Sequence, residues 1–329
     1  MEGNSQYNNP VKATLTGITN LFKSKERVGE LKESDRLDGK KVLITGSSSG
    51  LGLASAKQLA SLGAEVIMAV RSGIPEKGEE VKKASGSEKI QMLYVDLLDF
   101  NSIKDLVEQV KGKIGPLDVV ICNAGIVAGK ARKTKDGLEE MFMVNYVSSF
   151  YFLRLLLAQN LIKKNDPASR IVIVDSESHR DPKAFNWDDF GKFKEHKIGQ
   201  TVSLYGYYKL LLVTFAHELS RRLNDEQTTV SVFSLCPGPV NSNIAREAPA
   251  IFQPLLKLVF SLFFRSPEKA AEPVLYMSAS ADLNNKSWDY MFLMERKNVD
   301  PKATEQANGV KLWNLSNELI TSLGYPIGD

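Results

Sequence analysis

The stretch VSLYGYYKLLLV (202–213) holds three tyrosines within four residues, and a lysine follows the last of them directly. On a helix, Tyr205 and Lys209 project from one face a single turn apart, whereas Tyr207 lies about 200° round from Tyr205. A lysine ammonium favours the phenolate and lowers the pKa of a nearby tyrosine. Tyr205 could then exchange a proton with a carbonyl or alcohol oxygen. The alternative is that these aromatics only pack, which we predict for Tyr207, while Tyr208 lies at the edge of the Tyr205 face.

A glycine-rich turn follows the first apolar run of the chain. In TGSSSGLG, the residues Thr45, Gly46, Gly50 and Gly52 stand between a predicted strand and a predicted helix. Glycines let the backbone approach a pyrophosphate closely, and the helix N-terminus supplies unpaired N–H groups and a favourable dipole. The spacing is G-x-x-x-G-x-G rather than G-x-G-x-x-G, but its position predicts a dinucleotide site.

The end of the second predicted strand bears on the choice between the two nicotinamide cofactors. A carboxylate at this place would bind the ribose 2′-hydroxyl and select NAD, but here Val70 is followed by Arg71. Arginine forms charge-assisted, bidentate contacts with a 2′-phosphate. The sequence therefore predicts NADP(H), with an ordinary surface arginine as the alternative.

Two further turns fall at the carboxyl ends of predicted strands, where open α/β sheets bind ligands. Asp96 follows the third strand and could accept a hydrogen bond from the adenine amino group. Asn123, Ala124 and Gly125 follow the fourth strand and leave room for the cofactor. Taken singly, each of these could be an ordinary loop residue.

Apolar runs alternate with amphipathic segments from Lys40 onward. We predict strands over 41–45, 65–70, 89–95, 117–122, 170–174, 229–236 and 289–293, and helices over 52–62, 102–113, 137–160 and 203–223. Strands separated by such helices form βαβ units in a parallel sheet that is covered on both faces. The predicted fold is a Rossmann-type, doubly wound α/β domain with three α/β/α layers over 38–329, preceded by a polar leader over 1–37.

Composition limits the class of protein and its partners. Of 329 residues, 43% are hydrophobic and 25% charged, which is typical of a globular protein that is not membrane-spanning. The net charge of +3 disfavours nucleic acid as the main partner, and the basic run KARKTKD is predicted to be a solvated loop.

Cys122 and Cys236 are predicted to be separate buried thiols, which favours a reducing, cytoplasmic location. Scattered histidines predict no metal site, and the polar start MEGNSQYNNP predicts no signal peptide.

Thr-Gly-x-x-x-Gly-x-Gly, Asn-Ala-Gly and Tyr-x-x-x-Lys, in this order and on these elements, resemble the short-chain dehydrogenase/reductase family. The resemblance covers about 40–320 and is greatest to the retinol-dehydrogenase-like branch, through VLITGSSSGLG, VNYVSSF, RIVIVDSESH and VDPKATEQANGVKLWNLSNELI. It implies that Ser176 holds the substrate oxygen, that Tyr205 is the acid/base, and that Lys209 binds the nicotinamide ribose and lowers the tyrosine pKa. It also implies that Asn145 anchors a water that relays protons from Lys209.

The motifs and the resemblance together predict a cofactor-binding set. Its members are Thr45, Gly46, Ser48, Ser49, Gly50, Leu51, Gly52, Arg71, Asp96, Leu97, Asn123, Ala124, Gly125, Tyr205, Lys209, Pro237, Gly238, Val240 and Ser242. Two residues depart from the family's pattern: Tyr208 stands where serine is common, and Asp175 stands where the closest relatives usually have a second serine. The segment from Ser176 to Tyr205 is longer than in typical members, as in the retinol-dehydrogenase-like branch.

The resemblance places a substrate-covering segment over about 244–266. Its bulky apolar residues, concentrated in 251–264, are too apolar all round for a helix exposed to water. Three interpretations stay open: a lid over an apolar substrate, a peripheral membrane contact, and a homodimer face.

These features predict an NADP(H)-dependent oxidoreductase that interconverts a carbonyl and an alcohol by hydride transfer. The expected substrate is apolar: a retinoid, a prenol, a steroid or a similar lipid-like molecule. One alternative is a reductase of C=C bonds or pigment precursors in the same family. The other is a non-catalytic NADP-binding regulator, which would have no physical need for Asn145, Ser176, Tyr205 and Lys209 together.

Overall fold

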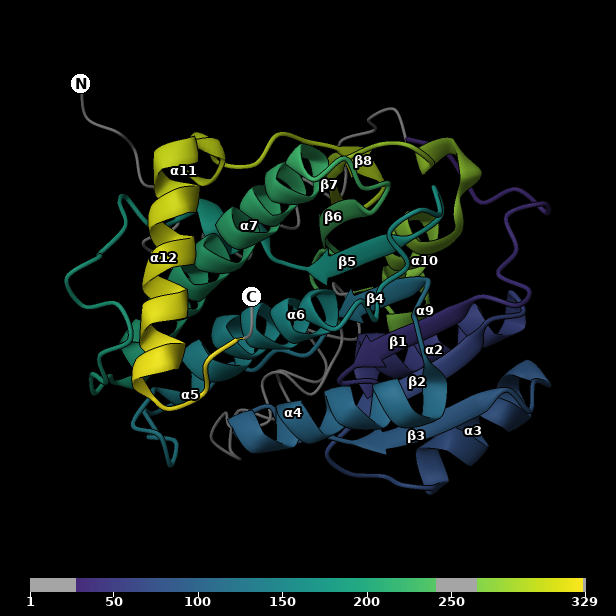
Figure 1. Cartoon of the computed structure of the whole chain (residues 1–329), viewed down its shortest axis with the longest axis horizontal. Helices are drawn as coiled ribbons and strands as arrows, with labels where there is room; N and C mark the ends of the chain where they lie inside the picture. The colour runs from purple at the N-terminus through teal and green to yellow at the C-terminus, as the bar shows by residue number, and fades with distance from the viewer. Residues whose placement is uncertain (1–27, 241–264, 328–329) are drawn as a thin grey trace.

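The computed structural model describes residues 28–240 and 265–327 (Figure 1). Within these ranges the chain forms an eight-stranded sheet in the order β3-β2-β1-β4-β5-β6-β7-β8. The strands are β1 (Lys41–Thr45), β2 (Glu65–Val70), β3 (Ile90–Tyr94), β4 (Val119–Cys122), β5 (Arg170–Val174), β6 (Ser231–Cys236), β7 (Trp288–Phe292) and β8 (Glu295–Arg296). The neighbouring pairs from β3 to β7 are parallel, and β8 pairs antiparallel with β7. The predicted doubly wound sheet is confirmed.

Helices cover both faces of the sheet. One face carries α2 (Gly50–Ser61), α3 (Glu76–Ser85), α9 (Pro267–Ala270) and α10 (Glu272–Ala279). The other carries α4 (Phe100–Gln109), α6 (Ser148–Ala158), α7 (Thr201–Asp225) and α12 (Gln306–Ser322), which lie in front of the sheet in Figure 1. The strands are buried between these two layers, and β4 and β5 are buried at every position. This explains their continuous apolar runs.

The strand order reverses between β1 and β4, which are neighbours although two strands separate them in sequence. The chain runs outward from β1 to β3 and then crosses back to β4, with Val42 opposite Val119. Loops at the carboxyl ends of β1 and β4 therefore diverge to opposite sides. In open α/β sheets such a switch point forms the ligand crevice.

The predicted strands over 41–45, 65–70 and 170–174 are confirmed to the residue. The helix predicted over 137–160 begins later, as α5 (Glu140–Phe142), and contains a π-helical turn, η2 (Met143–Val147), before α6. Several further elements, among them α3, α10, α12 and β8, are absent from the sequence-based assignment. In α3 only Gly78 and Val81 are buried, so this helix lacks the apolar stripe that predicts one.

The last residues of the predicted leader pack on the domain. The Val28 N–H donates to the Met294 carbonyl at 2.8 Å, and the Asp35 carboxylate accepts from the Ala281 N–H at 3.0 Å. Residues 1–27 lie outside the described part of the chain.

Among the described residues, one helical segment, Glu140–Ala158, has the length and composition to cross a membrane, but 78% of its most apolar window is buried within the protein. This burial is that of a core helix.

Candidate active site

A cleft of about 440 Å³ opens at the carboxyl ends of the strands and collects most of the predicted site residues. From the catalytic set it contains Ser176, Tyr205 and Lys209. From the cofactor set it also contains Gly46, Ser48, Ser49, Gly50, Leu51, Gly52, Arg71, Asp96, Leu97, Asn123, Ala124, Gly125, Pro237, Gly238 and Val240. Thr45 and Asn145 do not line it, and Ser242 lies outside the described residues. Residues more than 190 positions apart thus meet in one cleft.

The glycine turn after β1 has no room for side chains. A Cβ at Gly52 would lie 2.4 Å from the Gly46 carbonyl oxygen and 2.5 Å from Asn123 Nδ2. Gly46 has φ +67°, and a Cβ there would lie 2.9 Å from the Ala124 Cα. The backbone of this turn therefore packs directly on the Asn-Ala-Gly turn, as the predicted pyrophosphate site requires.

Hydrogen bonds fix the two turns to each other. Asn123 Nδ2 donates to the carbonyls of Thr45 at 2.9 Å and Gly46 at 3.1 Å. Thr45 Oγ1 in turn accepts from the Asn123 N–H at 3.1 Å and the Ala124 N–H at 3.3 Å. Thr45 is buried and does not line the cleft, and its hydroxyl positions the turn that does, so its contact with the cofactor stays a prediction.

The start of α2 faces the cleft through Ser48, Ser49 and Gly50. Ser49 is the N-cap, and within the described chain its side chain makes no capping hydrogen bond. The first N–H groups of a helix have no partner inside the helix and attract an anion. The cleft residues therefore fit a dinucleotide, with its pyrophosphate at this helix end.

Arg71 and Asp96 lie together at the ends of β2 and β3. Arg71 Nη1 is 3.8 Å from Asp96 Oδ1, and the Arg71 side chain is 54% exposed. Asp96 Oδ1 also accepts from the Leu98 N–H at 3.0 Å. The arginine is thus free to turn toward a ligand phosphate, because its ion pair is long and solvent-exposed.

Tyr205 and Lys209 project from α7 toward the end of β5, as their spacing predicts. Lys209 Nζ lies 5.7 Å from the centre of the Tyr205 ring and donates to the Val174 carbonyl at 2.8 Å. Ser176 begins the short 3-10 helix η3 (Glu177–Arg180), and its Oγ accepts from Ser178 Oγ at 2.9 Å. The Ser176 side chain is close enough to the Tyr205 phenol to lower the pKa of that phenol.

Gly206 is a site residue that sequence reasoning missed. A Cβ at this position would lie 2.7 Å from the Ser178 carbonyl oxygen. The lack of a side chain lets α7 approach η3 closely, which brings Tyr205 to Ser176. A glycine inside a long, otherwise apolar helix is the signal that could have revealed it, because glycine disfavours helix without a packing reason.

The charges around Tyr205 differ from the expectation. Burial raises the pKa of Tyr205, and the negative charge of Asp175 raises it further, while the nearby Ser176 side chain opposes both. Burial lowers the pKa of Lys209, against the attraction of Asp175. Among the residues of the chain alone, desolvation and a nearby carboxylate raise the tyrosine pKa, and its lowering by Lys209 together with the cationic nicotinamide ring of a bound cofactor stays a prediction.

Asn145 lies in the π-helical turn η2, behind the cleft wall. Its Oδ1 accepts from the Ile126 N–H and its Nδ2 donates to the Ile126 carbonyl, both at 2.8 Å. These bonds fix the backbone just after the Asn-Ala-Gly turn. Single π-helical turns within α-helices, such as η2, are frequent at functional sites.

Tyr208 does not lie in the cleft, contrary to the expectation that it borders the active face. Its side chain is buried in the core, with its ring centre 5.5 Å from that of Phe142. Tyr207 is half-buried, packs against the same core and accepts from the Asn186 N–H at 3.1 Å. The departure at Tyr208 therefore changes the core packing of α7 and not the lining of the cleft.

The basic run KARKTKD is a loop whose three lysines are exposed, as predicted, and several of its side chains also have partners. Arg132 lines the cleft and pairs with Glu140. Lys135 Nζ lies 2.6 Å from Asp99 Oδ1, and Lys133 lies over the Phe193 ring. The residue types favoured a solvated loop, and only the fold brings these partners to them.

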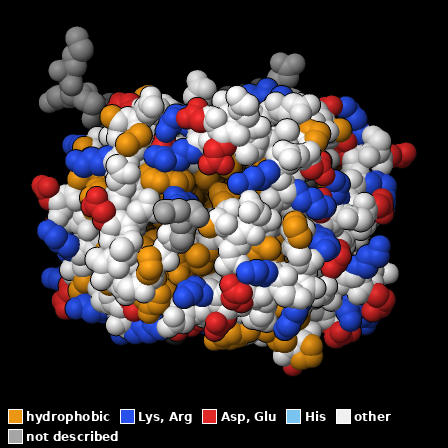
Figure 2. All heavy atoms as spheres, viewed as in Figure 1, with side chains coloured by type: hydrophobic (Ala, Val, Ile, Leu, Met, Phe, Trp, Pro, Cys, Tyr) orange, Lys and Arg blue, Asp and Glu red, His pale blue; other side chains and the backbone are white. Residues whose placement is uncertain are grey.

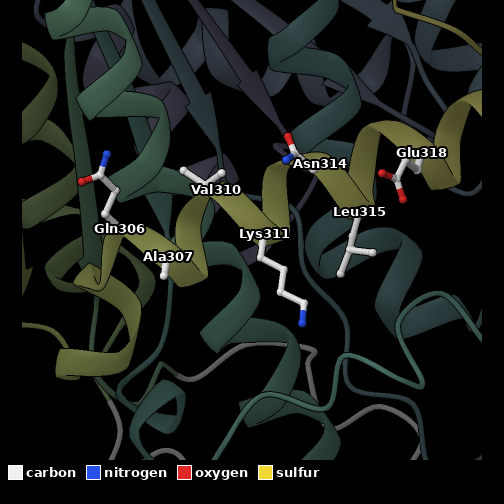
Figure 3. Close-up of a pocket in the computed structure, with 7 residues that line it drawn as sticks. All are labelled: Gln306, Ala307, Val310, Lys311, Asn314, Leu315 and Glu318. Carbon is white, nitrogen blue, oxygen red and sulfur yellow. The ribbon is translucent and has the colours of Figure 1, made fainter.

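A second hollow, of about 580 Å³, is a shallow groove lined by α12 alone (Figure 3). Its residues are Gln306, Ala307, Val310, Lys311, Asn314, Leu315 and Glu318. It lacks the convergence of elements that builds an active site. Charges of both signs are interspersed over the visible face (Figure 2).

The apolar segment 251–264 lies outside the described residues, so its three interpretations stay predictions. The described chain on either side meets at one point: the Arg265 N–H donates to the Pro239 carbonyl at 3.0 Å, and Val240 and Arg265 form an isolated parallel bridge. Pro239 and Val240 both line the cleft.

Known proteins resemble this chain in sequence and in fold. The family model for short chain dehydrogenase matches residues 40–186. "Retinol dehydrogenase 14" of Homo sapiens is 33% identical over 301 residues, which cover 86% of this chain and 87% of that protein. "Polyprenol dehydrogenase" of Homo sapiens is 30% identical over 281 residues, 84% of each chain.

Among solved structures, an uncharacterized protein from Mycobacterium Paratuberculosis superposes with a TM-score of 0.69 at 24% identity, over 92% of this chain and 100% of its own. The "Pseudomonas aeruginosa RhlG/NADP active-site complex" superposes with a TM-score of 0.61 at 20% identity, over 80% of this chain and 98% of its own. At these identities the likeness shows the fold alone.

Proposed function

The chain belongs to the short-chain dehydrogenase/reductase family, and on that premise we propose that it interconverts a carbonyl and an alcohol on an apolar substrate. The observation that carries the proposal is the meeting of Ser176, Tyr205 and Lys209 at the cleft that also holds the glycine turn. A bound nicotinamide cofactor supplies the hydride in reduction and accepts it in oxidation.

Each of the three side chains has one task in this proposal. Ser176 binds the substrate oxygen through its hydroxyl, which the hydrogen bonds of η3 hold toward Tyr205. Tyr205 gives its phenolic proton to that oxygen in reduction and takes it back in oxidation. Lys209, fixed by the Val174 carbonyl, carries the positive charge that stabilises the phenolate when it forms. Asn145 supports the neighbouring backbone at Ile126.

The cofactor in this proposal is NADP(H) rather than NAD(H). Support comes from Arg71, which lines the cleft at the end of β2 where an NAD-selecting carboxylate would otherwise stand. Arg71→Ala is expected to raise the Kd for NADPH about 10- to 100-fold, because a charge-assisted hydrogen bond contributes about 1.5–3 kcal/mol. The Kd for NADH should stay unchanged. The matched control is Arg36→Ala, which removes an exposed arginine that pairs with Asp38.

The substrate class follows from the relatives and from the sequence. Two relatives are named for retinol and polyprenol, both long apolar alcohols. We propose a retinoid, prenol, steroid or similar lipid-like aldehyde, ketone or alcohol for this chain. The test is turnover of a panel of apolar and polar aldehydes and alcohols, each with NADPH, NADH or their oxidised forms. Turnover confined to polar substrates, or the absence of any turnover with both cofactors, would contradict the proposal.

A further inference from the structure

Asp175 is a carboxylate at the inner end of the cleft that the proposed reaction does not use. It directly follows β5, between Val174 and Ser176, and it lines the cleft. Its side chain has no solvent exposure. Neither carboxylate oxygen has a hydrogen-bond partner among the described residues. A buried carboxyl group without a hydrogen-bond partner destabilises the folded protein, so its presence in the cleft wall calls for a functional reason.

The nearest candidate partner, His179, has its ring hydrogen bonds committed elsewhere. Its Nδ1 lies 2.7 Å from the Ser176 carbonyl oxygen, and its Nε2 lies 3.2 Å from the Asp300 backbone nitrogen. Because the Asp300 N–H donates to Nε2, the ring proton sits on Nδ1 and points to the Ser176 carbonyl. Asp175 Oδ2 lies 3.6 Å from Nδ1, beyond hydrogen-bond distance. The histidine is neutral because burial lowers its pKa to about 4.

Several ionisable groups surround Asp175. They are Tyr205 and Lys209 on α7, Glu177, His179 and Arg180 on η3, Cys236 at the end of β6, and Tyr290 on β7. Glu177 is held by Arg180, by Lys297 and by the Tyr290 hydroxyl at 2.9 Å. Lys209 is therefore the cation whose attraction acts most strongly on Asp175.

We propose that Asp175 is a positioning residue of the active site, whose carboxylate opposes the Lys209 ammonium and so sets the pH range over which Tyr205 carries its proton. The proposal concerns the same site as the proposed function and rests on it.

The order in which Asp175 and Tyr205 ionise supports this role. Burial raises the pKa of Asp175, against the attraction of Lys209. The pKa of Tyr205 is raised above its ordinary value of 10.0. A carboxyl group ordinarily ionises at a much lower pH than a phenol, so the negative charge of Asp175 is present when Tyr205 titrates. The two ionisations belong to one coupled cluster with Lys209.

The direction in which the Asp175 charge acts on Tyr205 also supports this role. A carboxylate next to the phenol disfavours the phenolate, so it keeps Tyr205 protonated to higher pH. Protonated tyrosine is the form that donates to a carbonyl oxygen. Asp175 thus extends carbonyl reduction toward alkaline pH and delays the onset of alcohol oxidation. A serine at this position would lack this effect.

The test compares the full-length wild-type protein with Asp175→Asn, which keeps the shape of the side chain and removes its ionisation. Without the carboxylate, the alkaline limb of kcat/KM for carbonyl reduction should move to lower pH by about one unit or more, and the onset of oxidation should move the same way. Asp282→Asn is the matched control, because it makes the same charge change at an exposed position outside the cleft. An unchanged limb, or one that moves to higher pH, would overturn the proposal.

A second readout does not need turnover. Phenolate absorbance is titrated in the ultraviolet for the wild type and for Asp175→Asn, each with and without Tyr205→Phe. The difference between the two curves of each pair reports the ionisation of Tyr205 alone. The difference curve should lie at lower pH in the Asp175→Asn background than in the wild type. Coincident curves would refute the inference even if the enzyme were active. If no substrate is turned over but the curves separate, the proposed function fails, and only the electrostatic effect of Asp175 on Tyr205 is supported. Asp175→Ser serves in both assays if Asp175→Asn fails to fold.

Discussion

Replacing Gly52 by alanine tests whether the glycine turn is built for close backbone approach. The added Cβ would lie 2.4 Å from the Gly46 oxygen and 2.5 Å from Asn123 Nδ2, whereas ordinary contact begins at 3.4 Å. One side of the turn must therefore move by roughly 1 Å. Overpacking of this kind costs about 1–3 kcal/mol.

The movement also affects the hydrogen bonds of Asn123. Its Nδ2 donates to the carbonyls of Thr45 and Gly46, and each bond contributes about 0.5–1.5 kcal/mol. The free energy of unfolding of Gly52→Ala should therefore fall by about 2–6 kcal/mol in chemical denaturation. Cofactor binds beside the displaced backbone, so its Kd should rise at least about tenfold in calorimetric titration, which corresponds to 1.4 kcal/mol.

Gly112→Ala is the matched control for this variant. Gly112 lies in the π-helical turn η1 (Val110–Ile114), and a Cβ there would have nothing within 4 Å. Alanine at this exposed helical position should leave the cofactor Kd unchanged and stabilise the protein slightly, by up to about 1 kcal/mol. Wild-type stability and cofactor affinity in Gly52→Ala would refute the close-approach reasoning.

Two other variants test how η3 positions the site. Gly206→Ala should lower kcat by a larger factor than it raises the cofactor Kd. The reason is that a Cβ 2.7 Å from the Ser178 oxygen separates α7 from η3 and therefore Tyr205 from Ser176. Steady-state kinetics and parallel binding measurements test this prediction, and equal effects on kcat and on the Kd would contradict it. His179 has its pKa lowered by burial from 6.5 to about 4, so the unfolded chain binds a proton that the folded chain does not as the pH falls from about 6.5 to about 4. The neutral ring therefore contributes stability that is fully present above pH 6.5 and is lost toward pH 4. In chemical denaturation across this range, the free energy of unfolding should depend less steeply on pH in His179→Gln than in the wild type. Equal slopes would show that His179 is not the group responsible.

The sheet could be predicted from sequence because its strands are buried on both faces. After one charged residue at the start of each strand, IVIV and VIMAV are apolar without interruption, and such runs specify a strand without knowledge of the neighbours. The helix α3 could not be predicted in the same way, because its contact with the sheet is made largely by Val81 and Gly78. Local pattern therefore identifies the elements that contribute most to the core.

The cleft was predicted more completely than its electrostatics. Glycine and tyrosine–lysine spacings are local properties, so Gly52, Tyr205 and Lys209 could be assigned from the sequence. The roles of Thr45 and Tyr208 depend on which side of an element faces the cleft, and that is decided by packing. The effect of Asp175 on Tyr205 depends on burial and on partners distant in sequence, which no motif records.

The most direct test of the central claim is the turnover of Tyr205→Phe, which removes one hydroxyl from the cleft. With NADPH and the best apolar aldehyde of the panel, kcat/KM should fall by about 100-fold or more, the usual contribution of a general acid. The Kd for NADPH should remain within about twofold of the wild type, because the ring and Lys209 stay in place. Wild-type turnover in Tyr205→Phe, with the cofactor still bound, would contradict the assignment of Tyr205 as the acid–base group.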